Sequence, residues 1–445
     1  MTNTREPRLL KTPWTASAAT VVAAFGAYFC MYAFRKPFTV ATYSEVEGIA
    51  GVKFKVALVI IQVFGYMVSK FIGIRYIAEV QPHERVRSLL IQVGLAELAL
   101  LLFAVTPAPF NAIWLFFNGL MLGMIFGLIM GFLEGRRNTE ALLAALCTSF
   151  ILADGVVKSV GAWLLNLNVP EFWMPFTTGL LFALPLLFCC MILNRAPLPD
   201  VGDVEARGER VPMNAEARRS FLQKYGLGLA LIVLVYLLVT IARSVRADFA
   251  PEIWAGLGIT PDPSLFTYSE TVVALIILVL NGSMIFIANN RIAFFTALGL
   301  ATLGLGITAA IVEGLSAGLV SPFAFMVLLG LGLYLPYIAV HTTIFERFIA
   351  MTRDRGTIGH MMYLADAFGY LGYVVVLLVR ELSPNITSQS ILPFFKILCL
   401  VVAGAGSALM IPAVIYFRRI RGSTDAASDA VHGGGAAVAE NRASQ

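Results

Sequence analysis

Long apolar segments recur along almost the whole chain and constrain its fold more than any other feature. Of its 445 residues, 58% are hydrophobic and only 13% are charged, which excludes an ordinary soluble protein. Windows of about 20 apolar residues are long enough to cross a hydrocarbon core of about 30 Å. Only helices and closed barrels satisfy their backbone hydrogen bonds there. Because the apolar runs are continuous and do not alternate, they predict an all-α membrane protein.

Twelve such segments predict twelve transmembrane helices. The predicted spans are 16–38, 55–77, 88–106, 111–133, 142–166, 174–193, 224–246, 268–289, 293–313, 321–346, 358–380 and 391–417. Residues 195–223 are polar and rich in arginine and proline, so they predict a linker between two six-helix halves, 1–194 and 224–420. Residues 421–445 are rich in Ala, Gly and Ser and predict a disordered tail.

The distribution of positive charge predicts the orientation. With the N-terminus inside, the inner loops carry most of the arginines and the outer loops carry few. Both termini, the linker and the tail are therefore expected in the cytoplasm, with the chain in a cell (inner) membrane. The first apolar run has no cleavage signature after it, so it is expected to be a retained helix and not a signal peptide.

Charge and cysteine patterns argue against other classes of protein. The basic residues form no stripe, so nucleic-acid binding is not expected. The five cysteines form no Cys-x-x-Cys pattern, so we expect neither a metal site nor a disulfide framework. The sequence also has no nucleophile motif and no phosphate-binding loop. We therefore expect no cofactor and no enzyme activity.

Two arginines lie at matching places inside apolar segments. Arg35 follows Tyr28 by seven positions, and Arg243 follows Tyr236 by seven positions. A guanidinium is always charged, and its burial in a bilayer is costly. An anion gripped between the two arginines explains why the chain carries both. Tyr28 and Tyr236 are expected to line the same cavity.

The two halves also repeat elsewhere. Three pairs of identical residues keep almost one offset: Arg35 and Arg243, 208 positions apart; Asp154 and Asp366, 212 apart; and Glu134 and Glu346, 212 apart. Such a pattern indicates two parallel six-helix repeats, as in a major facilitator superfamily transporter. In that architecture the substrate lies near the midplane between the halves.

Three further cations are candidates for the same site: Lys36, Lys70 and Arg246. Lys70 lies in the middle of its predicted span and is expected to face the cavity. Lys36 and Arg246 lie near the outer ends of theirs. The alternative is that these side chains reach the membrane interface or pair with acids that lock helices together.

Short segments resemble the organophosphate:phosphate antiporters of the major facilitator superfamily. Phe34-Arg35-Lys36-Pro37-Phe38 is similar to the Arg-Lys-x-Phe motif on their first helix. Gly65-Tyr66-Met-Val-Ser69-Lys70-Phe71 is similar to their Tyr-Gly-x-Ser-Lys-Phe motif on the second helix. Arg243, followed by Asp248 and Pro251, resembles the opening of their seventh helix. The resemblance implies that the two arginines bind a substrate phosphate with Lys70 nearby.

The chain departs from that family at two places, which indicates a distant relationship. The family's Gly-x-x-x-Asp-Arg loop after the second helix is degraded here to Gly73-Ile-Arg-Tyr-Ile-Ala-Glu79 and His83-Glu84-Arg85. The fifth helix of the family carries a histidine near the site, where the fifth span of this chain offers Asp154 and Lys158.

Buried acids are candidates for proton coupling or charge balance. Asp154 and Lys158 are four residues apart and are expected to pair on one helix face. Asp366 has Tyr370 at the matching place, so we expect it either to bind and release a proton or to pair with a base across the cavity. A structural ion pair, or recognition of an amino group on the substrate, remains the alternative for both acids.

Six other polar residues are candidates for charge balance, gating or proton transfer. Glu97 in the third span could balance Lys70 or Arg35. Glu134, Arg136 and Glu346 are expected to form a cytoplasmic gate at the inner helix ends. His341 and His360 could each carry a proton, although a satisfied core histidine is the more common case.

Together these features predict a secondary transporter of a small organic anion, phosphorylated or phosphonate-like, working by alternating access. Coupling would be exchange for phosphate or proton symport through Asp366. One alternative is a proton-coupled carrier of a carboxylate or zwitterion, and another is a non-transporting membrane sensor on the same scaffold. The expected partners are the anion and the lipid bilayer, and the expected state is a monomer.

Overall fold

The computed structural model describes residues 14–133, 139–197, 215–260, 262–352, 358–383 and 390–420. The first half contains α1 (Trp14–Met31), α2 (Phe54–Glu79), α3 (Arg85–Val105), α4 (Ala112–Leu122), α5 (Ile125–Met130), α6 (Thr139–Asn166) and α7 (Met174–Leu193). The second half contains α9 (Ala215–Asp248), α10 (Ala250–Gly256), α11 (Pro263–Gly282), α12 (Asn290–Ser316), α13 (Pro322–Ala339), α14 (Phe345–Thr352), α15 (Ile358–Leu382) and α17 (Ile391–Arg419).

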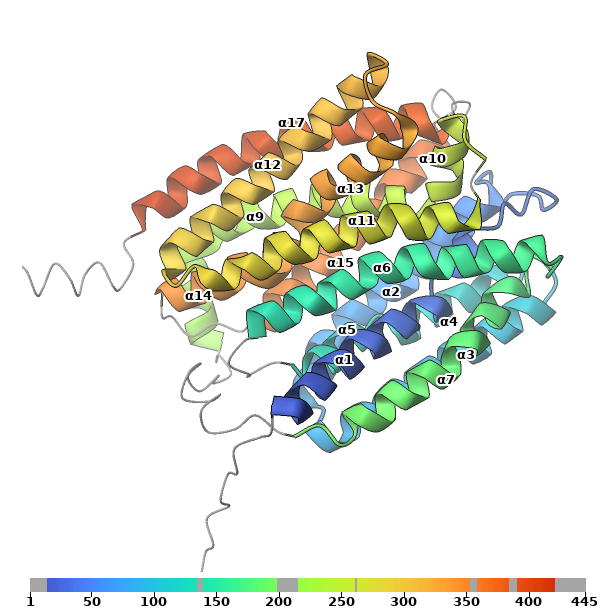
Figure 1. Ribbon diagram of the computed structural model, residues 1–445, viewed down its shortest axis with the longest axis horizontal. Coiled ribbons are helices and arrows are strands. Elements are labelled where there is room, and N and C mark those ends of the chain that lie inside the picture. The colour runs from blue at the N-terminus through green and yellow to red at the C-terminus, as the bar shows by residue number, and fades with distance from the viewer. Residues whose placement is uncertain are drawn as a thin grey trace, which may run out of the picture.

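The prediction of an all-α membrane fold in two six-helix halves is confirmed. Among the described residues, eleven helices are long and apolar enough to cross a membrane, and a shorter apolar helix spans Ala18–Phe34. Figure 1 shows the helices running side by side, with α1 to α7 in blue to green on one side and α9 to α17 in yellow-green to red on the other. The halves meet where α2 packs on α15 and α6 packs on α11.

Three predicted spans are interrupted in the structure, and this corrects their expected continuity. The first helix ends at Met31 and continues as two short 3-10 turns, Tyr32–Phe34 and Pro37–Thr39. Pro37 has no N–H to donate to an α-helical ladder. The fourth span is divided into α4 and α5, and the tenth contains a π-helical turn at Val340–Ile344.

The boundaries around the second half also differ from the prediction. Helix α9 begins at Ala215, inside the polar segment 195–223 that was predicted as a linker. Helix α11 begins where Asp262 caps its N-terminus by accepting a hydrogen bond from the Ser264 N–H. The hydrogen bonds from Ser264 hold the pKa of the Asp262 carboxyl below its usual range. The predicted tail 421–445 lies outside the described residues.

Candidate functional site

Arg35 lies on irregular backbone where the first helix breaks, and its side chain is surrounded by tyrosine rings. Its guanidinium carbon is 3.7 Å from the centre of the Tyr66 ring, 5.7 Å from that of Tyr370 and 6.0 Å from that of Tyr32. The residue is only 3% exposed, and its Nε has no hydrogen-bond partner within the described ranges. A full positive charge is therefore held inside the protein.

Two amides hold the broken backbone at Arg35. The Nδ2 of Asn118 on α4 donates to the Phe34 carbonyl at 2.9 Å and to the Ala96 carbonyl at 3.1 Å. The Nε2 of Gln62 on α2 donates to the Arg35 carbonyl and to Asn118 Oδ1, each at 2.9 Å. Non-helical backbone at membrane depth needs such partners because no water satisfies its carbonyls. Gln62 and Asn118 thus fix the position of Arg35.

Arg243 occupies an equivalent environment on the unbroken helix α9. Its guanidinium carbon is 4.3 Å from the Tyr337 ring centre, 5.9 Å from that of Tyr334 and 6.0 Å from that of Phe150. Arg243 is 7% exposed, and its Nε also has no partner in the described part of the chain. The two arginines therefore occupy corresponding positions in the sequence and also have similar aromatic surroundings in the structure.

One aromatic cluster connects the two arginines. Tyr32, which lies over Arg35, stacks on Phe150 with ring centres 6.4 Å apart, and Phe150 in turn contacts Arg243. Tyr370 from α15 packs on Tyr66 at 5.0 Å and interacts electrostatically with both guanidinium groups. The two positive charges therefore face one common region between the halves.

The other predicted cations of the site are neutralised by acids. Lys70 Nζ is 2.8 Å from Asp366 Oδ2, and Lys36 forms an ion pair with Asp248, which also accepts a hydrogen bond from Tyr373 at 3.0 Å. These pairs join the two halves, because each lysine comes from the first half and each aspartate from the second.

Arg246 and Lys158 are likewise paired and buried. Arg246 contacts Glu270 Oε1 at 2.8 Å and donates to the Met326 carbonyl at 2.8 Å. The expected pair of Asp154 and Lys158 forms at 2.5 Å. Of the charged groups predicted for the substrate site, only Arg35 and Arg243 lack an ion-pair partner among the residues that the structure describes.

The burial of Arg35 and Arg243 without an ion-pair partner among the described residues has an energetic consequence. Taking one ion out of water costs several kcal/mol even after the protein relaxes. A cation–π contact returns about 2 kcal/mol when it is desolvated. Aromatic rings alone therefore offset only part of the cost of burying Arg35 and Arg243. Each guanidinium carries five N–H donors, so each of these arginines has the chemistry to bind an anion.

Asp366 lies at the centre of a second cluster, in contact with both halves. It pairs with Lys70 and accepts a hydrogen bond from the Tyr236 hydroxyl, and the Nε2 of His341 lies 3.5 Å from its Oδ1. The ammonium of Lys70 also lies 4.6 Å from the Tyr363 ring centre. Of the two outcomes expected for Asp366, the structure shows pairing with a base, Lys70, of the other half. Tyr236 therefore belongs to this cluster.

The remaining predicted residues are placed as follows. Tyr28 is buried and packs its ring on Tyr32 and Phe126. Glu97 faces the α7 backbone at Gly179, and both its oxygens lack a hydrogen-bond partner within the described residues. The hypothesis that Glu97 balances Lys70 or Arg35 is wrong, because Lys70 pairs with Asp366 and Glu97 forms no hydrogen bond to Arg35 among the described residues. Glu346 is buried at the start of α14, whereas Glu134 and Arg136 lie outside the described residues.

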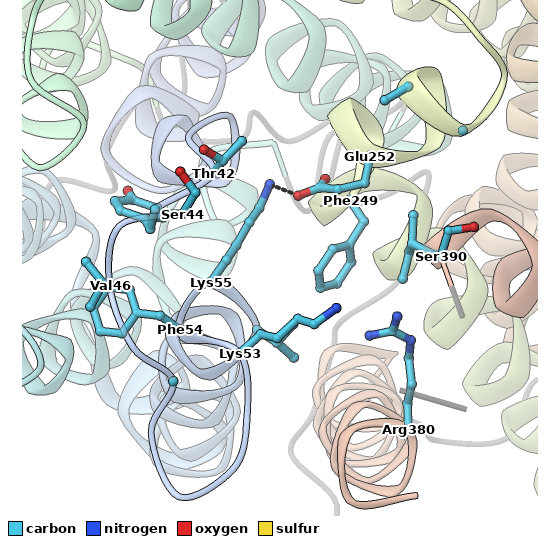
Figure 2. Close-up of a pocket in the computed structure, with 16 residues that line it drawn as sticks. Thr42, Ser44, Val46, Lys53, Phe54, Lys55, Phe249, Glu252, Arg380 and Ser390 are labelled. Carbon is cyan, nitrogen blue, oxygen red and sulfur yellow. Dashed lines mark hydrogen bonds and ion pairs between the residues drawn. The ribbon is translucent and has the colours of Figure 1, made fainter. Parts of the chain in front are cut away.

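A pocket of about 660 Å³ lies at the end of the bundle opposite the described chain ends. Both halves contribute to its lining, which includes Lys53 and Lys55 from the first half and Phe249, Glu252 and Arg380 from the second. Figure 2 shows Lys55 bonded to Glu252 across this end pocket, with Lys53 and Arg380 pointing toward one another. The Lys36–Asp248 pair is adjacent, since Asp248 precedes the lining residue Phe249.

Residues 37–420 match the model of a family of unknown function, DUF5690. The protein belongs to the DUF5690 family. No curated protein matches its sequence. Its structure is similar to that of the human organic anion transporter MFSD10 (TETRAN), with a TM-score of 0.56 and 14% sequence identity. The similarity covers 91% of this chain and 100% of that chain.

At this level of identity the similarity shows a shared fold, so this DUF5690 protein has a major facilitator fold. The finer resemblance to the organophosphate:phosphate antiporters stays a prediction. The sequence pointed to both arginines of the candidate site. It assigned no role to the residues that hold or surround them, namely Gln62, Asn118, Tyr66, Tyr334 and Tyr337. Polar amides inside apolar spans were the available signal for Gln62 and Asn118.

Proposed function

We propose that the protein is a secondary active transporter that binds a small organic anion between Arg35 and Arg243. The observation that carries this proposal is the pair of buried guanidinium groups, from opposite halves, that have no ion-pair partner within the described chain. The fold shared with an organic anion transporter supports it. A phosphate or phosphonate group is the favoured headgroup, because its oxygens accept bidentate hydrogen bonds from two guanidinium forks.

Transport would follow from the same geometry. Each half contributes one arginine, so an anion bound between them draws the halves together and neutralises charges that would otherwise repel. Inter-half pairs such as Lys36–Asp248 and Lys55–Glu252 would then break and form as the site opens to alternate sides. The chain would act as a monomer in a cell membrane with both termini in the cytoplasm, without a cofactor and without enzymatic chemistry.

The first test is exchange of radiolabelled inorganic phosphate in proteoliposomes. Wild-type protein should take up label when the lumen contains unlabelled phosphate, and organophosphates should compete better than carboxylates. Arg35→Ala and Arg243→Ala should each reduce uptake by about ten- to a hundredfold, as expected for the loss of a charged hydrogen-bonding group worth about 1.5–3 kcal/mol.

Arg75→Ala is the matched control, because Arg75 is exposed and forms its ion pair with Glu79 on its own helix. It should leave uptake unchanged. Neither arginine of the site leaves an orphaned carboxylate when it is removed, so folding should persist in both variants. Folded wild-type protein that exchanges neither phosphate nor any competing anion would refute the proposal.

A further inference from the structure

A π-helical turn places His341 in the interior between α13 and α14. The turn spans Val340–Ile344, and His341 is 3% exposed. Its ring packs against Tyr337 at 4.7 Å, Tyr236 at 5.3 Å and Phe126 at 5.9 Å, measured between ring centres. A π turn weakens the regular hydrogen-bond ladder and is found mostly at functional positions. The aromatic surroundings hold the imidazole in one orientation.

The two nitrogens of His341 differ in their surroundings. Nε2 lies 3.3 Å from the Tyr236 hydroxyl and 3.5 Å from Asp366 Oδ1. Nδ1 is buried and has no partner within the described part of the chain. A neutral imidazole carries one N–H and one acceptor nitrogen. With the N–H on Nε2 facing the carboxylate, Nδ1 is left as a proton acceptor without a donor.

We infer that Nδ1 of His341 is a proton-binding site that is filled when an anion occupies Arg243, so that anion and proton bind together. This inference rests on the proposed anion site. It assigns the coupling proton to His341, whereas Asp366 stays ionised in its pair with Lys70. The proton itself is the second ligand of the transporter.

The charges around His341 explain why binding of the anion and binding of the proton would be coupled. Burial of the ring opposes the imidazolium most, Asp366 on α15 favours it, and Lys70 on α2 and Arg243 on α9 oppose it further. The other titratable neighbours are Tyr236 on α9, Tyr337 on α13, and Cys147 on α6, which lies close to Asp366. The three ionised groups leave one net positive charge, and protonation of the empty site adds a second.

An anion bound to Arg243 neutralises the guanidinium and so removes its part of this opposition. The favourable interaction between bound anion and bound proton acts in both directions, because coupling between two binding sites is reciprocal. Anion affinity should therefore rise as the pH falls through the titration range of His341. The ion pair of Lys70 with Asp366 would supply little pH dependence of its own while both partners stay charged.

Isothermal titration calorimetry of the purified full chain with sulfate and benzenesulfonate tests the inference directly. Neither probe titrates over the range in which histidine changes charge, about pH 5 to 8. Measurements in two buffers of different ionisation enthalpy give the number of protons taken up per bound anion. Wild type should take up close to one proton, and its anion affinity should increase at least tenfold from the upper to the lower end of this range.

His341→Gln and His341→Asn should still bind the probe, with no proton uptake and no pH dependence. Gln places an amide near the Nε2 position and Asn near the Nδ1 position, so at least one should preserve the packing. His83→Gln, at an exposed position, should behave like wild type. Anion binding without proton uptake in wild type, or equal uptake in the His341 variants, would overturn the inference.

The outcomes separate the inference from the proposed function. Loss of binding in Arg243→Ala combined with no linked proton in wild type would leave the anion site intact and overturn the role of His341. Failure of both probes to bind wild type at any pH would overturn the anion site and the linkage together.

Discussion

The central cations of the molecule differ in what neutralises them. Lys36, Lys70 and Arg246 each contact a carboxylate, whereas Arg35 and Arg243 contact aromatic rings. A paired cation stabilises the fold of a particular state, because separating it from its acid leaves two buried charges. An arginine without an acid is ready to bind an anion. The two kinds of cation therefore have different roles in the proposed mechanism.

The Lys70–Asp366 pair should contribute coupled stability. Lys70→Met leaves Asp366 as a buried carboxylate without its cation, which should lower the free energy of unfolding by about 3 to 5 kcal/mol. The double variant Lys70→Met with Asp366→Leu should recover much of this loss, because it removes both charges. Thermal unfolding in detergent of the wild type, both single variants (Lys70→Met and Asp366→Leu) and the double variant gives the coupling energy, expected at about 1 to 3 kcal/mol. Additive losses in the double variant would show that the pair is not coupled.

The residues of the site were predictable from the sequence only where one segment carried the signal. Arg35 and Arg243 stand out because a guanidinium in an apolar span is costly wherever it points. The Asp154–Lys158 pair follows from helical spacing. Lys70 and Asp366 are 296 positions apart, so no local spacing links them. Among the tyrosines around the arginines, Tyr66 lies in a segment that resembles a family motif, whereas Tyr334 and Tyr337 carry no signal of their own.

Helix breaks are the features that the hydropathy pattern could not predict. The hydropathy of an apolar segment is the same whether its helix is continuous or interrupted. Hydropathy therefore predicts twelve spans but not the breaks near Arg35, Gly123 and His341. Their partners come from other helices: Gln62 and Asn118 satisfy the backbone beside Arg35. In discontinuous helices of transporters, such breaks commonly lie at the binding site.

Close packing of α2 on α4 positions the helix break near Arg35. A Cβ added at Gly119 would lie 2.1 Å from the Gln62 carbonyl oxygen. Gly119→Ala should therefore push the helices apart, lower stability by about 1 to 3 kcal/mol and weaken anion binding, since Gln62 holds the Arg35 carbonyl. Thermal unfolding and equilibrium anion binding measure the two effects.

Gly94 provides the control for this substitution. A Cβ at Gly94 on α3 meets no atom within 4 Å. Gly94→Ala should leave anion binding unchanged and should not destabilise the protein, because alanine is the better helix former. Equal losses in the two variants would contradict the packing argument.

At the scale of the whole molecule, the site lies where the two halves meet. Helices α2 and α15 contact one another, as do α6 and α11. Ion pairs cross the interface at Lys36–Asp248, Lys55–Glu252 and Lys70–Asp366. The overall fold was predictable from hydropathy and the internal repeat. The ion pairs across the interface depend on how the two halves pack, so local sequence patterns do not predict them.

The most direct test of this account is equilibrium binding of radiolabelled phosphate to purified wild-type protein, Arg35→Lys and Arg243→Lys. Lysine keeps the charge but loses the planar fork that binds two oxygens at once. Each variant should bind at least about tenfold more weakly, which corresponds to about 1.4 kcal/mol, and Arg75→Lys should bind like wild type. Phosphate affinity that is unchanged in both variants would contradict an anion held between Arg35 and Arg243.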